Sequence, residues 1–182
     1  MSALIPSGNA SGTGTMTLLA PATNGTQTVT MPDATGTMMV SGNMPAFSAY
    51  KTSSQTISSS TPTKITFDTE EFDTNNNFAS SRFTPTVAGY YQINSMINSI
   101  DSSSGVITGT ANYIYKNGTR YQDGIYIGST GKVSFGSLVY LNGTTDYIEI
   151  YGFIITTGTA SVYGSALGNG QSWISGCMVR GA

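Results

Sequence analysis

The chain has 182 residues, enough for one domain with its own core and a modest appendage, because domains usually run to about 100–150 residues. Only 9% of the residues are charged and the net charge is −2, so the chain offers no basic surface for phosphates, and nucleic-acid binding is not expected. No segment approaches the ~20 consecutive apolar residues of a membrane span, so we expect no membrane insertion.

Residues 1–44 are predicted to form an N-terminal docking arm. Its short strand-like segments, such as 26–31, alternate Thr with other residues but carry few large side chains. Each therefore buries too little apolar area to offset a backbone ordering cost of about 1–2 kcal/mol per residue. We expect the arm to hold its shape only against a larger assembly, whose other proteins would be its partners. Residues 1–6 lack the basic and apolar regions of a signal peptide, which favours assembly inside a cell.

Residues 45–182 are predicted to form an all-β head domain. About ten short strands, regular turn signals and no helical period indicate a β-sandwich or jelly roll. Its first elements are a short strand at 46–50 and a polar loop, rich in Ser and Thr, at 53–62.

The stretch 63–100 shows the two-residue period of a half-buried sheet. Ile65 and Phe67 are expected on one face of a strand. Residues 73–77, Asp-Thr-Asn-Asn-Asn, predict a turn because such side chains bond their own backbone. Residues 91–98 alternate again, which predicts a strand with one side facing a core and one facing water or a partner chain.

Two hairpins are predicted in the second half of the head. Between residues 107 and 127, Asn117 and Gly118 supply the positive φ values of a type I′ turn, so their flanks are expected to pair. Residues 132–141 and 147–155 are predicted as a second antiparallel pair. The stretch 147–155 is apolar on both faces, so we expect one face against the opposite sheet and the other against a second subunit.

With its elements in this order, the stretch from Pro45 to Ala182 resembles the globular heads of complement component 1q and the tumour-necrosis-factor superfamily. Aromatic, glycine and turn positions along the head carry the resemblance, together with the last strand: Phe67, Asp73, Phe78, Phe83, Gly89, Tyr91, Leu141, Asn142, Gly143, Asp146, Ile148, Ser172, Trp173, Ile174, Ser175 and Gly176. The resemblance implies a ten-stranded jelly roll that assembles as a compact homotrimer.

The arm carries a second resemblance. The sequence from Met16 to Thr37 is similar to segments of bacteriophage tail-fibre and appendage proteins, where they precede a trimeric head. Together the two resemblances imply a homotrimeric structural protein of a virion, exposed on the particle exterior, whose arm binds tail or capsid proteins. We expect a short tail fibre or fibre tip that contacts a host-surface glycan or receptor. A capsid decoration protein and a bacterial surface lectin-like adhesin are the alternatives.

The composition argues against an enzyme. The chain has no histidine, the commonest general base and metal ligand, so no catalytic residue, cofactor or metal site is predicted. Its single cysteine, Cys177, is predicted to be a small core residue of the last strand. Most tyrosines of the head are expected in the core and the three-fold interface, with sugar-stacking platforms as the alternative.

One acidic cluster leaves an alternative open. Asp68, Glu70, Glu71 and Asp73, with the asparagines 75–77, offer oxygen ligands of the kind that calcium takes. Their spacing differs from that of an EF-hand loop, so we favour a solvated loop between strands. A glycosidase pair is not favoured, because nothing in the sequence raises the pKa of one carboxylate relative to the other.

Overall fold

The computed structural model describes residues 44–166 and 171–182, together with a few earlier positions, 11–15, 17, 22, 25, 26, 28, 39, 40 and 42. The chain divides into two units, Met1–Gly36 and Thr37–Ala182. Most residues of the predicted arm lie outside the described positions, so the arm and its boundary at residue 44 stay predictions. Regular structure in the described part consists of strands, and it contains no helix long and apolar enough to cross a membrane.

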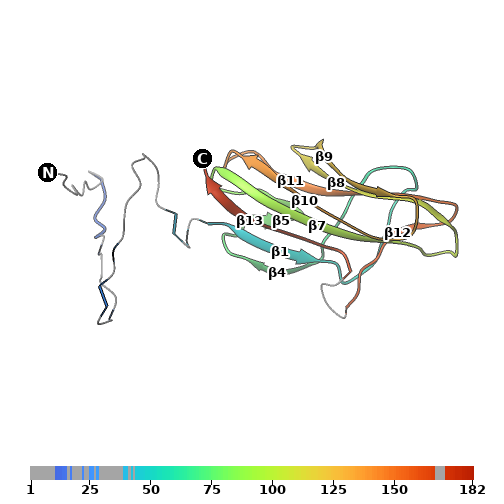
Figure 1. Cartoon of the computed structure of the whole chain (residues 1–182), viewed down its shortest axis with the longest axis horizontal. Helices are drawn as coiled ribbons and strands as arrows, with labels where there is room; N and C mark the ends of the chain where they lie inside the picture. The colour runs from blue at the N-terminus through green and yellow to red at the C-terminus, as the bar shows by residue number, and fades with distance from the viewer. Residues whose placement is uncertain are drawn as a thin grey trace. The chain divides into compact units, whose positions relative to one another are not determined.

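Thr37–Ala182 holds two antiparallel sheets, with thirteen strands among its described residues (Figure 1). Sheet A contains, in spatial order, β2 (Gln55–Thr56), β12 (Ala160–Val162), β7 (Gly89–Asp101), β13 (Trp173–Gly181), β1 (Ala46–Tyr50) and β4 (Thr69–Asp73), with β10 (Gly131–Leu141) also paired to β7. Sheet B contains β5 (Phe78–Ala79), β6 (Arg82–Phe83), β11 (Ile148–Thr156), β8 (Ile107–Lys116) and β9 (Thr119–Ile127), with β3 (Thr63–Lys64) also paired to β11.

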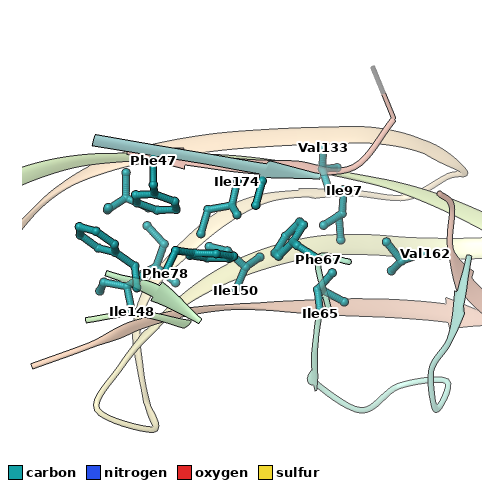
Figure 2. Packing of buried hydrophobic residues seen from close by; sticks show 14 of the residues in the cluster. Phe47, Ile65, Phe67, Phe78, Ile97, Val133, Ile148, Ile150, Val162 and Ile174 are labelled. Atoms are coloured by element: carbon teal, nitrogen blue, oxygen red, sulfur yellow. The ribbon is translucent and has the colours of Figure 1, made fainter. Parts of the chain in front are cut away.

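The core lies between the two sheets. Along β7, every second residue from Tyr91 to Ser99 is buried, as the alternation predicts. Figure 2 shows Phe47 and Ile174 of sheet A on one side of this space, with Ile148 and Ile150 of β11 on the other. Because the side chains of both sheets fill one common layer, the predicted two-sheet architecture is confirmed.

An aromatic cluster fills the core beside β1. The ring of Phe47 stacks on Phe78 and Phe83 with centroid distances of 5.0 and 4.2 Å, and Tyr91 meets Phe83 edge-on at 5.3 Å. The Tyr91 hydroxyl donates to the Val87 carbonyl at 2.6 Å, so its polar end is satisfied although burial raises its pKa. Three of these aromatic residues carry the family resemblance, and the role that they share here is packing.

Two predicted turns are confirmed. Asn117 and Gly118 have φ values of 54° and 76°, the left-handed pair of a type I′ turn, and β8 pairs with β9 across them. In the turn at 73–77, the Asp73 carboxylate accepts hydrogen bonds from two backbone N–H groups, including that of Phe78 at 2.6 Å. Both turns depend on residues within the turn itself, so the local sequence was sufficient to predict them.

The second predicted hairpin is wrong. β10 pairs with β7 in sheet A, whereas β11 pairs with β8 in sheet B, so residues 142–147 cross from one sheet to the other. Asn142 Oδ1 accepts from the backbone N–H groups of residues 144–146 at 3.0, 3.0 and 2.9 Å. The Asp146 carboxylate accepts from Asn117 Nδ2 at 2.7 Å, which anchors the crossing on the β8–β9 hairpin. Turn residues show that the chain bends, but not which sheet it enters next.

The described residues form more strands than the ten expected, because four of them, β2, β3, β5 and β6, have only two residues each. Ile65 and Phe67 are buried in the core as predicted, but they lie between β3 and β4 rather than on a strand. Such short strands form where a loop runs beside a longer strand. The alternation of apolar and polar residues within the loop does not predict this pairing.

Candidate functional site

The chain enters the sandwich at the end where its last strand finishes. The Pro45 carbonyl accepts from the Met178 N–H at 2.9 Å, and Ala46 lies opposite Cys177. The connections at the other end of the long strands are therefore the farthest from this point. We call them the far loops: residues 102–106, 128–130 and 157–159.

The outer face of sheet A carries exposed apolar side chains. Leu138 and Tyr140 of β10 lie opposite Gln92 and Tyr90 of β7, and the Tyr90 and Tyr140 rings are 5.4 Å apart. Leu138 is 52% exposed, Tyr140 40% and Tyr90 39%. Exposed apolar side chains on one sheet face are candidates for contact with a partner. We call this surface the apolar face and define it by its exposed apolar residues: Phe72, Tyr90, Leu138, Tyr140 and Val179.

Cys177 lies beside the apolar face, so its predicted place in the core is wrong. The core-facing residues of β13 are Ile174, Gly176 and Met178, which leaves Cys177 exposed and opposite Gln92. The usual burial of free cysteines suggested a core position, but the alternation of the strand decides the matter. In an assembly that covers the apolar face, the thiol would be covered as well.

The outer face of sheet B is also aromatic, but its rings contact one another. Tyr115 of β8 stacks on Tyr151 of β11 with centroids 3.8 Å apart, and Tyr113 is tilted against Phe153 at 6.3 Å. The Arg120 guanidinium lies over the Tyr113 ring at 3.8 Å. Tyr113 is consequently only 7% exposed although it faces away from the core. We call these four rings, Tyr113, Tyr115, Tyr151 and Phe153, the aromatic face.

A buried carboxylate joins the aromatic face to the edge of sheet B. Glu149 of β11 is 3% exposed, and its Oε1 accepts from Lys64 Nζ at 2.7 Å and from Arg82 Nε at 2.9 Å. The Arg82 guanidinium also lies over the Tyr147 ring at 3.8 Å. Burial by itself would raise the pKa of Glu149, but the hydrogen bonds and charges of the two cations outweigh it and lower the pKa. Glu149 therefore stays ionised and holds both cations in place.

The structure changes which surface is expected to meet a partner. The sequence pointed to the second apolar side of 147–155, but its rings Tyr147, Tyr151 and Phe153 are half-buried by side chains of the same chain. Sheet A carries the exposed aliphatic side chains Leu138 and Val179, whereas the exposed rings of sheet B, Tyr121 and Tyr126, lie on its last strand, β9. Side chains of β6, β8 and β9 cover the rings of β11. The pattern of residues within β11 alone does not predict which side chains these are.

The tyrosines occupy sheet surfaces more than the core. Tyr91 belongs to the central hydrophobic cluster, and Tyr113 is also buried although it lies outside that cluster. The prediction that most of them lie in the core and the three-fold interface taken together therefore stays a prediction.

The acidic cluster does not converge on one point. Asp68 accepts from the backbone N–H groups of Thr52 and Ser53 at 2.7 and 3.0 Å, and Glu71 accepts from a serine hydroxyl of β1 at 2.9 Å. Asp73 caps its own turn. Among the described residues, no group of three or more acidic or cysteine side chains has the arrangement of a metal site. This geometry favours the solvated-loop interpretation.

Lys51 is a buried cation that the sequence did not reveal. It is 2% exposed, and its Nζ donates to the Thr66 carbonyl at 2.5 Å and to Gln55 Oε1 at 3.4 Å. Burial lowers its pKa, while the charge of Asp68 acts in the opposite direction. Lys51 thereby ties the end of β1 to the loop around Thr66. A lysine that follows a strand gives no sign of this in the sequence.

Asp101 organises the far loops, a second feature that the sequence did not reveal. Its Oδ1 accepts from the N–H groups of Ser103 and Gly105, both at 2.8 Å, and its Oδ2 accepts from the Thr156 hydroxyl at 2.5 Å. The hydroxyl bond is the main cause that lowers the pKa of Asp101 to about 2. A Cβ atom on Gly158 would lie 2.5 Å from Asp101 Oδ2, so the network requires glycine there.

The head is similar in fold to two solved jelly-roll domains. It matches the globular domain of zebrafish complement 1qA with a TM-score of 0.50 and 16% identity, over 76% of this chain and 98% of that one. It matches murine APRIL at pH 8.0 with a TM-score of 0.54 and 7% identity, over 75% and 99%. No protein-family profile and no curated protein sequence matches the chain. The predicted all-β jelly roll of the complement 1q and tumour-necrosis-factor type is therefore confirmed.

Proposed function

We propose that this chain is a non-enzymatic structural protein of a bacteriophage virion, a homotrimer whose jelly-roll head is anchored to the particle by residues 1–44. The observation that carries the proposal is the apolar face, where Leu138 and Val179 are each 52% exposed. Covering such a surface stabilises an assembly by roughly 25 cal/mol per Å² of apolar area. A closed three-fold arrangement covers it in every copy and leaves no free face for open-ended growth.

Within the particle, the protein acts as a short tail fibre or fibre tip that contacts the host surface. The far loops support this role because they lie at the end of the head opposite to where the chain enters it. Asp101 holds the loop 102–106 in a defined shape and ties it to Thr156 through three short hydrogen bonds. Val106, 63% exposed in this loop, is available to a host glycan or receptor.

The proposal includes no catalytic activity. The chain has no histidine, and the carboxylates of Asp68, Asp73 and Asp101 accept hydrogen bonds that shape their own loops. A hydrolysis screen on host polysaccharide tests this point. We expect no turnover, and any turnover that copurifies with the trimer would contradict it.

Sedimentation of the full chain tests the observation that carries the proposal. At micromolar concentration we expect a species of three times the chain mass of 19.0 kDa. A stable, folded species of one chain mass would overturn the trimer and with it the main physical support for a particle component.

Copy number separates the fibre from its alternatives. A capsid decoration protein would be present in hundreds of copies per particle, whereas a tail fibre would be present in a few trimers. A bacterial lectin-like adhesin would be found in the cell envelope and not in purified particles. Quantitative mass spectrometry of purified virions and of host envelopes distinguishes these outcomes.

A further inference from the structure

A depression lies at the edge of sheet B, on the β5–β6 side. Its volume is about 440 Å³, which is within the range of small-ligand sites. Hydroxyl, amide and cationic side chains dominate its lining: Lys64, Asn76, Ser80, Arg82, Thr84 and Thr86. The lining therefore offers several hydrogen-bonding groups to a ligand.

Arg82 is held in position before a ligand arrives. Its Nε and Nη2 contact Glu149 Oε1 at 2.9 and 2.8 Å, and its guanidinium rests on the Tyr147 ring at 3.8 Å. A guanidinium carries five N–H groups, so this contact leaves others for a ligand, and the side chain is 42% exposed. Because the side chain is already ordered, binding costs less conformational entropy.

The cluster keeps a positive charge. Lys64 and Arg82 share the single carboxylate of Glu149, which leaves one net positive charge in a chain whose total is −2. An anion at the depression is favoured by this charge, and a carboxylate matches the planar fork of an arginine.

The turns around the depression are held in unusual backbone conformations. Asn76, Ser80 and Ser81 have φ values of 54°, 52° and 56°, and serine rarely occupies this left-handed region. The Ser81 hydroxyl accepts from the Phe67 N–H at 2.8 Å, which fixes the second turn from inside. The two turns thereby place Asn76 and Ser80 in the lining on either side of β5.

We propose that this depression binds a uronic acid residue of an acidic saccharide. Arg82 and Lys64 bind the sugar carboxylate, while Asn76, Ser80 and Thr86 bind ring hydroxyls. The depression belongs to sheet B, so it stays accessible when the apolar face of sheet A is covered. The inference gives the host-contacting role a ligand class, and it rests on that role for the source of the saccharide.

Titration of the full-chain protein with methyl glucuronide tests the inference, with binding followed by chemical-shift changes or calorimetry. Methyl glucoside, which lacks the carboxylate, and acetate, which lacks the sugar, are the control ligands. We expect saturable binding of the glucuronide and affinities at least about ten-fold lower for both controls. Absence of glucuronide binding, or equal binding of either control, would overturn the inference.

Two arginine variants locate the site. Arg82→Gln is expected to weaken glucuronide binding by at least about ten-fold. Arg120→Gln is the matched control, because Arg120 also lies on a tyrosine ring at 3.8 Å and pairs with a carboxylate, but outside the depression. Equal affinity in the Arg82 variant and in the wild type would contradict the assignment.

A second variant covers the case in which Arg82→Gln does not fold. Thr86→Val removes one exposed hydroxyl from the lining and keeps the side-chain shape, so we expect several-fold weaker binding; unchanged affinity would count against the site. Sedimentation separates the two proposals: a stable trimer that does not bind the glucuronide overturns this inference alone.

Discussion

The two outer faces of the sandwich are both rich in tyrosine, yet only the aromatic face is largely covered within one chain. There, Tyr115 and Tyr151 stack at 3.8 Å. On the apolar face, Tyr90 and Tyr140 are tilted at 5.4 Å and remain 39% and 40% exposed. The comparison teaches that composition does not decide how far a sheet face is covered within one chain. Cross-strand neighbours decide it.

The cationic side chains that lie beside the tyrosine rings differ between the two faces. On sheet B, Arg82 and Arg120 each lie 3.8 Å from a tyrosine ring, and each is fixed by a carboxylate. Beside the apolar face, Lys116 of β8 lies 5.8 Å from the centre of the Tyr140 ring, farther than either arginine from its tyrosine. The guanidinium groups of Arg82 and Arg120 therefore cover tyrosine rings on sheet B. Tyr90 and Tyr140 on the apolar face remain more exposed.

The largest expected effect comes from placing a charge on the apolar face. Leu138→Asp would bury a carboxylate without a partner in any assembly through this face, at a cost of several kcal/mol. We expect sedimentation to shift from the trimer to a single folded chain.

Val106→Asp is the control for this variant, because Val106 is also exposed, at 63%, but lies in the far loops. It should leave the trimer intact. A trimer that persists in the Leu138 variant would show that another surface holds the copies together.

The next effect tests how far the aromatic face depends on its buried charge. Glu149→Gln removes the charge that holds Lys64 and Arg82, and we expect a loss of about 2 kcal/mol in unfolding free energy, because hydrogen bonds to charged groups contribute about 1.5–3 kcal/mol. Urea denaturation at fixed protein concentration measures it.

Asp123→Asn is the matched change on the same face, since Asp123 also pairs with an arginine that lies on a tyrosine. Its side chain is 59% exposed, so the expected loss is about 0–1 kcal/mol. Equal losses in the two variants would contradict the role assigned to burial.

A smaller effect compares the two tyrosine pairs directly. In a double-mutant cycle, Tyr115 and Tyr151 are replaced by leucine singly and together. We expect a coupling energy of about 1 kcal/mol between them, as for other stacked rings. For Tyr90 and Tyr140 in a monomeric background, such as the Leu138→Asp variant, we expect less than about 0.5 kcal/mol. Equal couplings would remove the distinction between the faces.

The smallest effect is a pH dependence that involves neither face. The pKa of Asp101 is about 2 in the folded chain, below the ~3.9 of an unfolded aspartate, so its stabilising contribution is present above about pH 4 and is lost as the pH falls towards 2. Asp101→Asn should therefore lower the melting temperature at neutral pH, and this difference should shrink between about pH 4 and pH 2. A constant difference would contradict the depressed pKa.

Much of the fold was predictable from the sequence, and little of the candidate sites was. The alternation from Tyr91 to Ser99 and the Asn117-Gly118 turn are local signals, and both predictions are confirmed. The proposed saccharide site joins Lys64, Arg82 and Glu149, which lie on three strands. No pattern within one strand indicates that the three side chains meet.

The errors share one cause. The pairing of 132–141 with 147–155 and the burial of Cys177 were both inferred from neighbours in sequence. In the structure, sheet membership and side-chain direction depend on strands far away in the chain. Residues 142–147 turn in a way that their own side chains determine, but the sheet that they lead into depends on the pairing of β11 with β8.

The sequence by itself determined the β class, the main turns and the alternating core positions, because these follow from the two-residue period of a strand and from the conformations that Asn, Asp and Gly allow. Tertiary structure alone decided which outer face stays exposed, where Cys177 lies and which charges meet at Glu149. These features depend on which strands become neighbours, and antiparallel pairing brings together residues as far apart as Lys64 and Glu149.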